Sequence, residues 1–171
     1  MFLKLTSILD RPGESLPFKT ELNLSDMEFG GVAIVQEPVV VEGRVENRAG
    51  VLVMNASMET TLHCVCDRCL KPFLLPRKQE FSVIIVQEET DDMPVDAYPM
   101  AENECVDIDE IATTVFVLEM DSRFLCSPEC KGLCHRCGKD LNQGPCDCKA
   151  EIDPRLAVLA QLLESQNKDS D

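Results

Sequence analysis

Cysteine is the residue type in this sequence whose spacing predicts chemistry. Two thiols three positions apart with a glycine directly after them form a tight turn, and the backbone amides of this turn point at the sulfurs and stabilise their charge. Cys134 and Cys137, followed by Gly138, have this pattern, a zinc knuckle, and Cys146 and Cys148 supply a second pair after eight intervening residues. Four thiolates at this spacing can converge on one Zn²⁺ in a closed, structural site. We therefore predict a first zinc site, called site 1, at these four cysteines.

Two further cysteine pairs predict a second zinc site. Cys66 and Cys69 form another knuckle between two predicted strands, and Cys126 and Cys130 are spaced so that both sulfurs lie on one side of a helical turn. A lone pair cannot complete a tetrahedron, and neither pair has a complement nearby in the sequence. The two distant pairs are therefore expected to share a second Zn²⁺, at site 2, which would connect the two halves of the chain.

Two alternatives to this assignment remain open on the sequence alone. One is a single zinc held by Cys130, Cys134, Cys137 and one of Cys146 and Cys148. The other is a thiol–disulfide redox pair made by Cys66 and Cys69. Against the redox pair, this knuckle does not open a helix after a strand, so no helix N-terminus would lower the pKa of either thiol.

Alternation of apolar and polar residues predicts the strands that position the first knuckle. A clear period of two begins at Val39, is interrupted by a turn at 47–50, and continues on the buried face as far as Cys64. Residues 81–86 return as another strand. We therefore predict an antiparallel meander over roughly 37–87.

Weaker or different patterns flank this meander. Extended stretches around 2–8 and 18–24 precede it, and 87–110 holds ten acidic residues and no Lys or Arg, which is typical of a solvated acidic loop. Apolar residues at helical spacing predict a helix over 108–118, and a terminal helix is predicted over 153–163.

The expected fold class is α+β. It combines an antiparallel β meander with one packed helix, a C-terminal zinc-knuckle module and a terminal helix. We divide the chain into a β-rich body over 1–125, which includes the acidic loop, and a zinc-binding module with the C-terminal helix over 126–171.

Composition restricts the classes of function. With 16 Lys and Arg against 31 Asp and Glu, the 171-residue chain has a formal net charge of −15, which argues against a membrane-surface binder and against DNA gripped by a wide basic face. No run of about 18 apolar residues and no signal peptide is apparent, so we expect a cytoplasmic protein that makes no membrane contact. With two histidines and no nucleophile–base pair or phosphate loop, the sequence does not indicate an enzyme.

The charges are unevenly distributed. A basic cluster beside the first knuckle consists of Arg68, Lys71, Arg77 and Lys78. The cysteine-bearing segments 64–80 and 123–155 together hold ten basic and seven acidic residues, which leaves −18 for the rest of the chain. Because binding to RNA by counterion release needs several unopposed cations, the basic cluster is expected to make at most a local contact with RNA. The acidic stretch suits a basic protein as the partner.

Two cysteine-bearing stretches also resemble a known family. They read CDRCLKPF over 66–73 and CKGLCHRCGKDLN over 130–142, with CDC at 146–148 and DPRLA at 153–157. The chain is similar here to the bacterial YceD family, the large ribosomal RNA subunit accumulation proteins. The resemblance implies a role in the accumulation of large-subunit (23S) ribosomal RNA. It therefore makes a ribosomal protein or a large-subunit assembly intermediate the expected partner, with local rRNA contact at the basic cluster. It also implies that the zinc of site 1 is structural, because only some family members carry the second half of the cysteine pattern.

These observations favour one function over an alternative. The favoured function is that of a non-enzymatic factor that supports large-subunit rRNA accumulation and ribosome biogenesis by binding protein, RNA or both. The alternative is a thiol- and zinc-based redox sensor, in which oxidation ejects the metal and exposes apolar surface.

Overall fold

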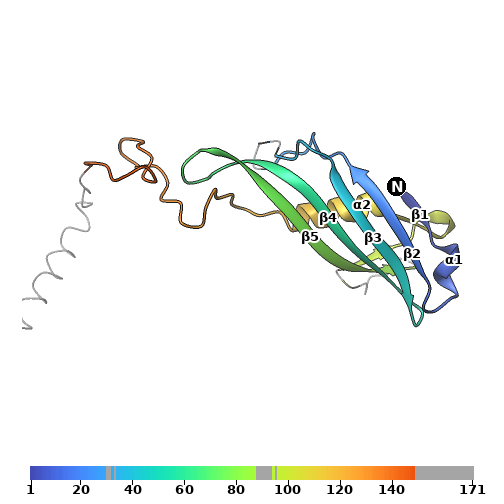
Figure 1. The fold of residues 1–171 in the computed structure, drawn as a ribbon. Helices are drawn as coiled ribbons and strands as arrows, with labels where there is room; N and C mark the ends of the chain where they lie inside the picture. The colour runs from blue at the N-terminus through green and yellow to red at the C-terminus, as the bar shows by residue number, and fades with distance from the viewer. Residues whose placement is uncertain (30–31, 33, 88–93, 95, 149–171) are drawn as a thin grey trace, which may run out of the picture.

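A five-stranded sheet dominates the fold (Figure 1). A computed structural model describes residues 1–29, 32, 34–87, 94 and 96–148. The strands follow one another in chain order across the sheet: β2 (Ser15–Leu22), β3 (Val39–Arg48), β4 (Val51–Val65), β5 (Pro72–Val86) and β6 (Ala97–Pro99). The first four strands pair antiparallel, and β6 joins β5 in parallel.

The meander predicted for 37–87 is present but begins earlier, at β2. Residues 15–22 pair along their whole length with 39–46. Only Phe18 and Leu22 are buried in β2, whereas Thr20 and Leu16 are partly exposed. This incomplete alternation explains why the sequence indicated only a weak extended stretch there. The extended stretch predicted for 2–8 divides into β1 (Phe2–Lys4) and a short helix α1 (Thr6–Leu9).

The acidic stretch 87–110 is not the single loop that its charge predicted. Its described part contains β6, a short 3-10 helix (Glu102–Glu104) and β7 (Cys105–Asp107), which pairs antiparallel with β1. Ala97 and Val106 bury their side chains, and these two apolar residues anchor the stretch against the body. Residues 88–93 and 95 of the predicted loop lie outside the described residues.

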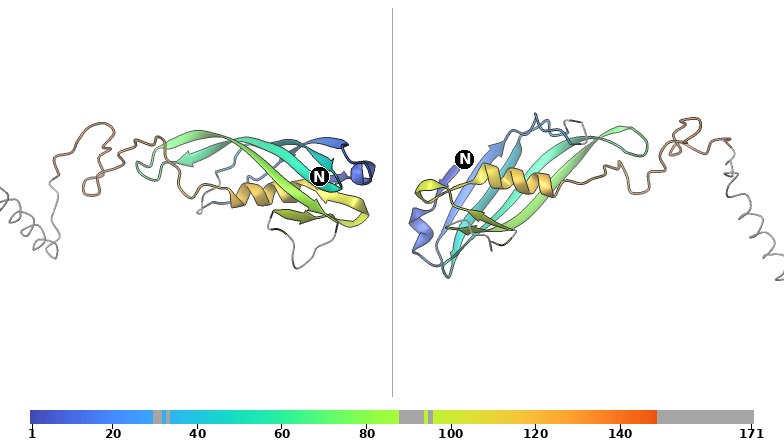
Figure 2. Two further views of the ribbon diagram at one scale, coloured as in Figure 1. Left: turned by 90° about the horizontal axis from the view of Figure 1, so that it is seen from below. Right: turned by 180° about the vertical axis from the view of Figure 1, so that it is seen from behind.

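Helix α2 (Ile108–Leu118) covers one face of the sheet, as predicted (Figure 2). Its N-cap is Asp107, whose side chain accepts a hydrogen bond from the backbone N–H of Asp109 at 3.1 Å. The helix buries an apolar stripe consisting of Ile108, Ile111, Ala112, Val115 and Phe116. The stripe packs with the inward residues of the sheet in one aliphatic core.

The β4–β5 hairpin positions the first knuckle. Both strands are 15 residues long, and their tip extends past the end of α2 (Figures 1 and 2). The knuckle at 66–70 occupies this tip, between the paired residues Val65 and Pro72. The chain that follows α2 continues alongside the hairpin toward this tip and so brings the later cysteines near it (Figure 1).

Arg77 fixes the start of the segment that follows α2. Its guanidinium donates to Asp121 Oδ2 at 2.9 Å, to Gln79 Oε1 at 3.2 Å and to the backbone carbonyl of Glu119. The same group lies 6.0 Å from the centre of the Phe116 ring. Only 13% of the Arg77 side chain is exposed. Strand β5 is thereby joined to the end of α2.

Two further expectations concern the terminal helix and membrane-spanning segments. The terminal helix predicted over 153–163 lies outside the described residues. None of the helices in the described residues has the length and apolar character to cross a membrane.

Replacing Arg77 should therefore cost much more stability than replacing its neighbour Lys78. Arg77→Met keeps an apolar stem but removes the bonds to Glu119 and Asp121, so we expect the free energy of unfolding to fall by about 2 kcal/mol. Lys78→Met removes only an ion pair with Glu59 in which both side chains are more than half exposed, and we expect little change. Urea denaturation measures both variants, and an equal loss of stability would contradict the role of Arg77.

Candidate metal centres

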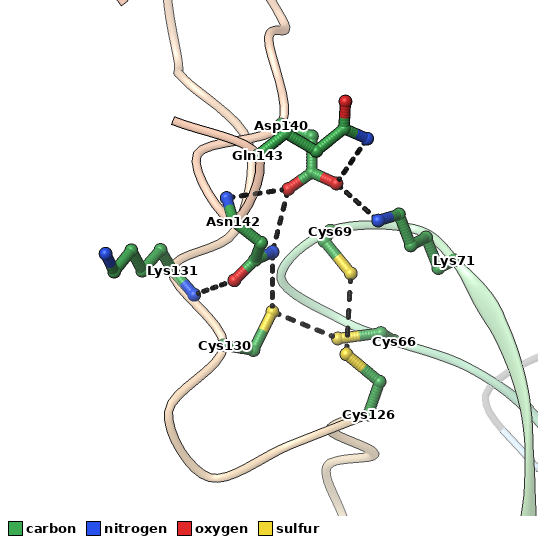
Figure 3. Close-up of polar contacts among 9 residues, drawn as sticks. All are labelled: Cys66, Cys69, Lys71, Cys126, Cys130, Lys131, Asp140, Asn142 and Gln143. Carbon is green, nitrogen blue, oxygen red and sulfur yellow. Dashed lines mark hydrogen bonds and ion pairs between the residues drawn. The ribbon is translucent and has the colours of Figure 1, made fainter. Parts of the chain in front are cut away.

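The structure brings together the four cysteines predicted for site 2 (Figure 3). The four Sγ atoms of Cys66, Cys69, Cys126 and Cys130 lie within 4.8 Å of one another. The distance is 3.8 Å between the sulfurs of Cys66 and Cys130, and 3.6 Å between those of Cys69 and Cys126. Four sulfurs placed tetrahedrally about 2.3 Å from a zinc ion are about 3.8 Å apart. The donor set and its spacing therefore fit one tetrahedral metal ion.

The four cysteines predicted for site 1 also converge. The sulfurs of Cys134, Cys137, Cys146 and Cys148 lie within 4.8 Å of one another. Cys134 is buried, whereas Cys137 and Cys148 are exposed. Site 1 is built entirely from one short segment, and it is more open to solvent than site 2. Cys130 belongs to the other cluster, so the described residues do not assemble the single mixed site that the sequence left open.

The two knuckles have the same type of backbone turn. The N–H of Leu70 donates to the carbonyl of Cys66 at 2.8 Å, and the N–H of Gly138 donates to the carbonyl of Cys134 at 2.8 Å. The residue after the second cysteine adopts a positive φ in both, 58° at Leu70 and 71° at Gly138. Glycine adopts this conformation without strain, but leucine does not.

Hydrogen bonds of backbone and side-chain groups join the hairpin tip to the C-terminal segment around site 2. Asp67 donates its N–H to the carbonyl of Phe124 at 2.9 Å and accepts the N–H of Phe124 on Oδ2 at 2.7 Å. The carbonyl of Arg68 accepts from the N–H of Leu133 at 3.0 Å, and its guanidinium donates to the carbonyl of Cys130 at 2.8 Å. The sulfurs are therefore held by a surrounding frame of bonds between the two segments.

A polar network that the sequence analysis missed extends this frame (Figure 3). The ammonium of Lys71 lies 2.5 Å from Asp140 Oδ2, and it lowers the pKa of this carboxyl group to about 2. Asn142 donates from Nδ2 to Asp140 Oδ1 at 2.7 Å and to the sulfur of Cys130 at 3.4 Å. Both Asp140 and Asn142 lie in the GKDLN stretch that carries the family resemblance, which is the signal that could have indicated them.

Hydrogen bonds lower the pKa of at least one cysteine in each site. The pKa of Cys66 is lowered to about 6, chiefly by the backbone N–H of Cys126, and that of Cys134 to about 6, chiefly by the backbone N–H of Cys137. The pKa of Cys126 is raised to about 12, chiefly by its hydrogen bond with Cys69. A cluster of this kind holds a thiolate at neutral pH and loses its remaining protons when a cation binds.

The two remaining cysteines lie outside both sites. Cys64 is buried in β4, as its phase predicted, and burial raises its pKa. Cys105 is half-buried in β7, and its thiol lies 3.5 Å from the carbonyl of Asn103.

The predicted basic cluster is not a set of free cations. Arg68 and Lys71 bond to the site 2 frame, and Arg77 joins β5 to the end of α2. Lys78 forms an ion pair of 2.6 Å with Glu59. In so acidic a chain each of these cations has a carboxylate or carbonyl partner, which reduces the charge that the cluster offers to an external phosphate.

Gly132 should be essential to the frame around site 2. Its φ is +75°, and an added Cβ would lie 2.9 Å from the carbonyl oxygen of Arg68, which accepts the bond from Leu133. Gly138 is a matched control, because its φ is +71° but an added Cβ would meet nothing within 4 Å. Gly138→Ala should lower the free energy of unfolding by about 1 kcal/mol from backbone strain alone.

Gly132→Ala carries the same strain and also displaces Arg68, so its loss of stability should be clearly larger. Denaturation of the two variants side by side tests this, and equal losses would show that the close approach does not matter.

Comparisons with known proteins relate these sites to a family. No solved structure matches the chain. "Uncharacterized protein YlbN" of Bacillus subtilis is 26% identical over 160 residues, which covers 92% of this chain and 93% of that protein. "Uncharacterized protein Mb2951c" of Mycobacterium bovis is 30% identical over 120 residues, covering 67% of this chain and 56% of that protein.

A maize relative has a descriptive name. "Large ribosomal RNA subunit accumulation protein YCED homolog 1, chloroplastic" of Zea mays is 28% identical over 159 residues. The match covers 74% of this chain and 54% of the maize protein, so the chain spans about half of that relative's length. The model of the family "Large ribosomal RNA subunit accumulation protein YceD" matches residues 54–163, which include β5 and all eight clustered cysteines. Because this match covers more than half of the sequence, the chain belongs to the YceD family.

Proposed function

We propose that this protein is a non-enzymatic factor that supports large-subunit (23S) rRNA accumulation during ribosome biogenesis. The observation that carries the proposal is the pair of four-cysteine clusters within a chain of the YceD family. The family and the maize relative are named for accumulation of large-subunit rRNA and not for a class of reaction. The ten free thiols are compatible with a reducing compartment, and we place the function in the cytoplasm.

We propose that each cluster binds one Zn²⁺. Four thiolates favour zinc over magnesium or calcium, and four protein ligands leave no open position for a substrate or water. A metal in such a site stabilises the fold and does not activate a reactant. The chemistry of the sites therefore supports a binding function.

The partner that we propose is a basic ribosomal protein or a large-subunit assembly intermediate. The formal charge of −15 and the acidic stretch 87–110 favour a cationic protein as the partner. RNA contact is the smaller part of the proposal. We assign it to Lys78, whose side chain is 62% exposed, and we assign to Arg68, Lys71 and Arg77 the structural roles described above.

The alternative function is redox sensing at site 1. It is favoured by one observation, the exposure of Cys137 and Cys148, because exposed thiolates react with oxidants faster than buried ones. Under this alternative, loss of zinc from site 1 would be the signal itself.

Zinc content distinguishes these possibilities. We expect two zinc ions per chain, one fewer in Cys69→Ser and in Cys134→Ser, and no change in Cys105→Ser, because Cys105 belongs to neither cluster. Metal analysis before and after mild peroxide extends the test. Retention of both ions supports a binding factor, and release from site 1 supports the sensor. An unchanged content in Cys134→Ser would refute site 1.

Sedimentation with large-subunit precursors tests the binding function. Neutralising Asp91, Asp92, Asp96 and Glu102 should slow association and flatten its dependence on salt, because steering by exposed charge is screened over about 8–10 Å at ordinary ionic strength. Lys78→Glu should weaken crosslinking to RNA and spare the protein partner. Arg11→Glu is the control, because Arg11 is exposed near the opposite end of the sheet. Normal rRNA levels and normal sedimentation in the first two variants would contradict the assigned contacts.

A further inference from the structure

An apolar groove lies beside site 2 and shares Cys66 with it. It is bounded by the hairpin tip, the end of α2 and the segment that leads to Cys126, and it has a volume of about 570 Å³. Eight large apolar side chains are exposed among the described residues, and four of them line this groove. These four are Val32, Val65, Leu70 and Val117. Half of the large exposed apolar side chains of the described residues thus lie together in one concave place, as at protein-binding sites.

Leucine is an energetically unfavourable residue at position 70 for two independent reasons. It is 65% exposed, so its side chain gains little from burial within the chain. It also has a φ of 58° at the turn position where the second knuckle has Gly138. Glycine would relieve the strain and remove the exposed side chain. A bulky residue at this position is explained if an external molecule covers it.

The walls of the groove are held rigidly by the frame around site 2. Asp67 and Phe124 both line it, and two hydrogen bonds of 2.9 and 2.7 Å join them, one residue from the hairpin tip and the other from the segment that leads to Cys126. Cys66 lines the same groove and is a member of site 2. The groove is therefore formed in advance of binding, which reduces the entropy that a ligand must lose on docking.

The charged residues that line the groove are all acidic. They are Glu28, Asp67 and Asp121, and no Lys, Arg or His is found among the described residues of the lining. Asp121 is ion-paired with Arg77, whereas Glu28 and Asp67 have no ion pair within the described part of the chain. A ligand that combines apolar side chains with flanking cations would match this lining.

We propose that the groove binds an amphipathic protein segment with an apolar face and flanking Lys or Arg residues. That the segment comes from a partner in large-subunit assembly rests on the proposed function. Leu70 and Val117 are the anchors, and the acidic residues of the rim select for basic flanks. This binding mode resembles that of an amphipathic helix laid in an apolar groove.

A synthetic peptide tests the groove independently of any natural partner. The probe is an amphipathic helix of leucine and lysine, with leucine at positions i, i+3, i+4 and i+7, and the full chain is titrated with it. Leu70→Gly and Val117→Ser should each weaken binding by about tenfold, as expected for loss of a buried apolar side chain. Leu118→Ser is the matched control, because Leu118 is adjacent and more exposed but does not line the groove.

Two further measurements serve as controls for specificity and for stability in the peptide titration. The same peptide with glutamate in place of lysine should not bind. The thermal midpoint of Leu70→Gly should equal or exceed that of the original chain, because the substitution removes backbone strain. A loss of binding in a variant that is at least as stable cannot be attributed to unfolding.

Three results would overturn the proposal. The first is equal peptide affinity in Leu70→Gly and the original chain. The second is tighter binding after Leu159→Glu, which would show that the chain's own C-terminal segment occupies the groove. The third is a dimer that Leu70→Gly dissociates, which would identify a second copy as the occupant.

Sedimentation with large-subunit precursors separates the failure of this inference from that of the proposed function. If the original chain and Leu70→Gly sediment equally with precursors, the groove is not the contact and the proposed function stands. If the original chain does not sediment with precursors at all, the proposed function fails, while the peptide titration still decides whether the groove binds a basic amphipathic segment.

Discussion

The position of the segment from Met120 to Cys148 depends on the convergence of four sulfurs from two distant parts of the chain at site 2. The sulfur pairs join residues that are 64 and 57 positions apart in the chain. The segment from Met120 to Cys148 has no helix or strand of its own, so it has little regular backbone bonding to hold it. Its position comes from the cysteines, from the Asp67–Phe124 and Arg68–Leu133 bonds, and from the clamp that Arg77 forms at its start.

Sequence patterns predicted the parts of the fold in which local periodicity reflects burial. The strands from Val39 onward and the apolar stripe of α2 are of this kind. The grouping of the cysteines was predicted separately, from the spacing that metal ligands need. Strand β2 was only partly indicated, because its pairing with β3 and not its own weak alternation determines it. Asp140 and Asn142 were missed because their partners, Lys71 and Cys130, come from other segments, and their bonds follow only from the folded arrangement.

The contacts made in the folded chain also change the interpretation of the basic cluster. A sequence count presents the basic cluster as an RNA-binding patch beside the knuckle. In the folded chain, Arg68, Lys71 and Arg77 instead hold the hairpin tip, the end of α2 and the GKDLN stretch together. What remains for a partner is an acidic surface and an apolar groove with an acidic rim, which together fit a basic protein better than bare RNA.

Hydrogen exchange with and without zinc tests most directly whether site 2 holds the two segments together. We predict that removing zinc with a chelator abolishes protection of the Asp67 and Leu133 amides, which bond across the segments, while amides at the centre of β4 stay protected. Undiminished protection of Asp67 and Leu133 in the zinc-free protein would show that the segments associate without a metal, and would contradict the central role of site 2.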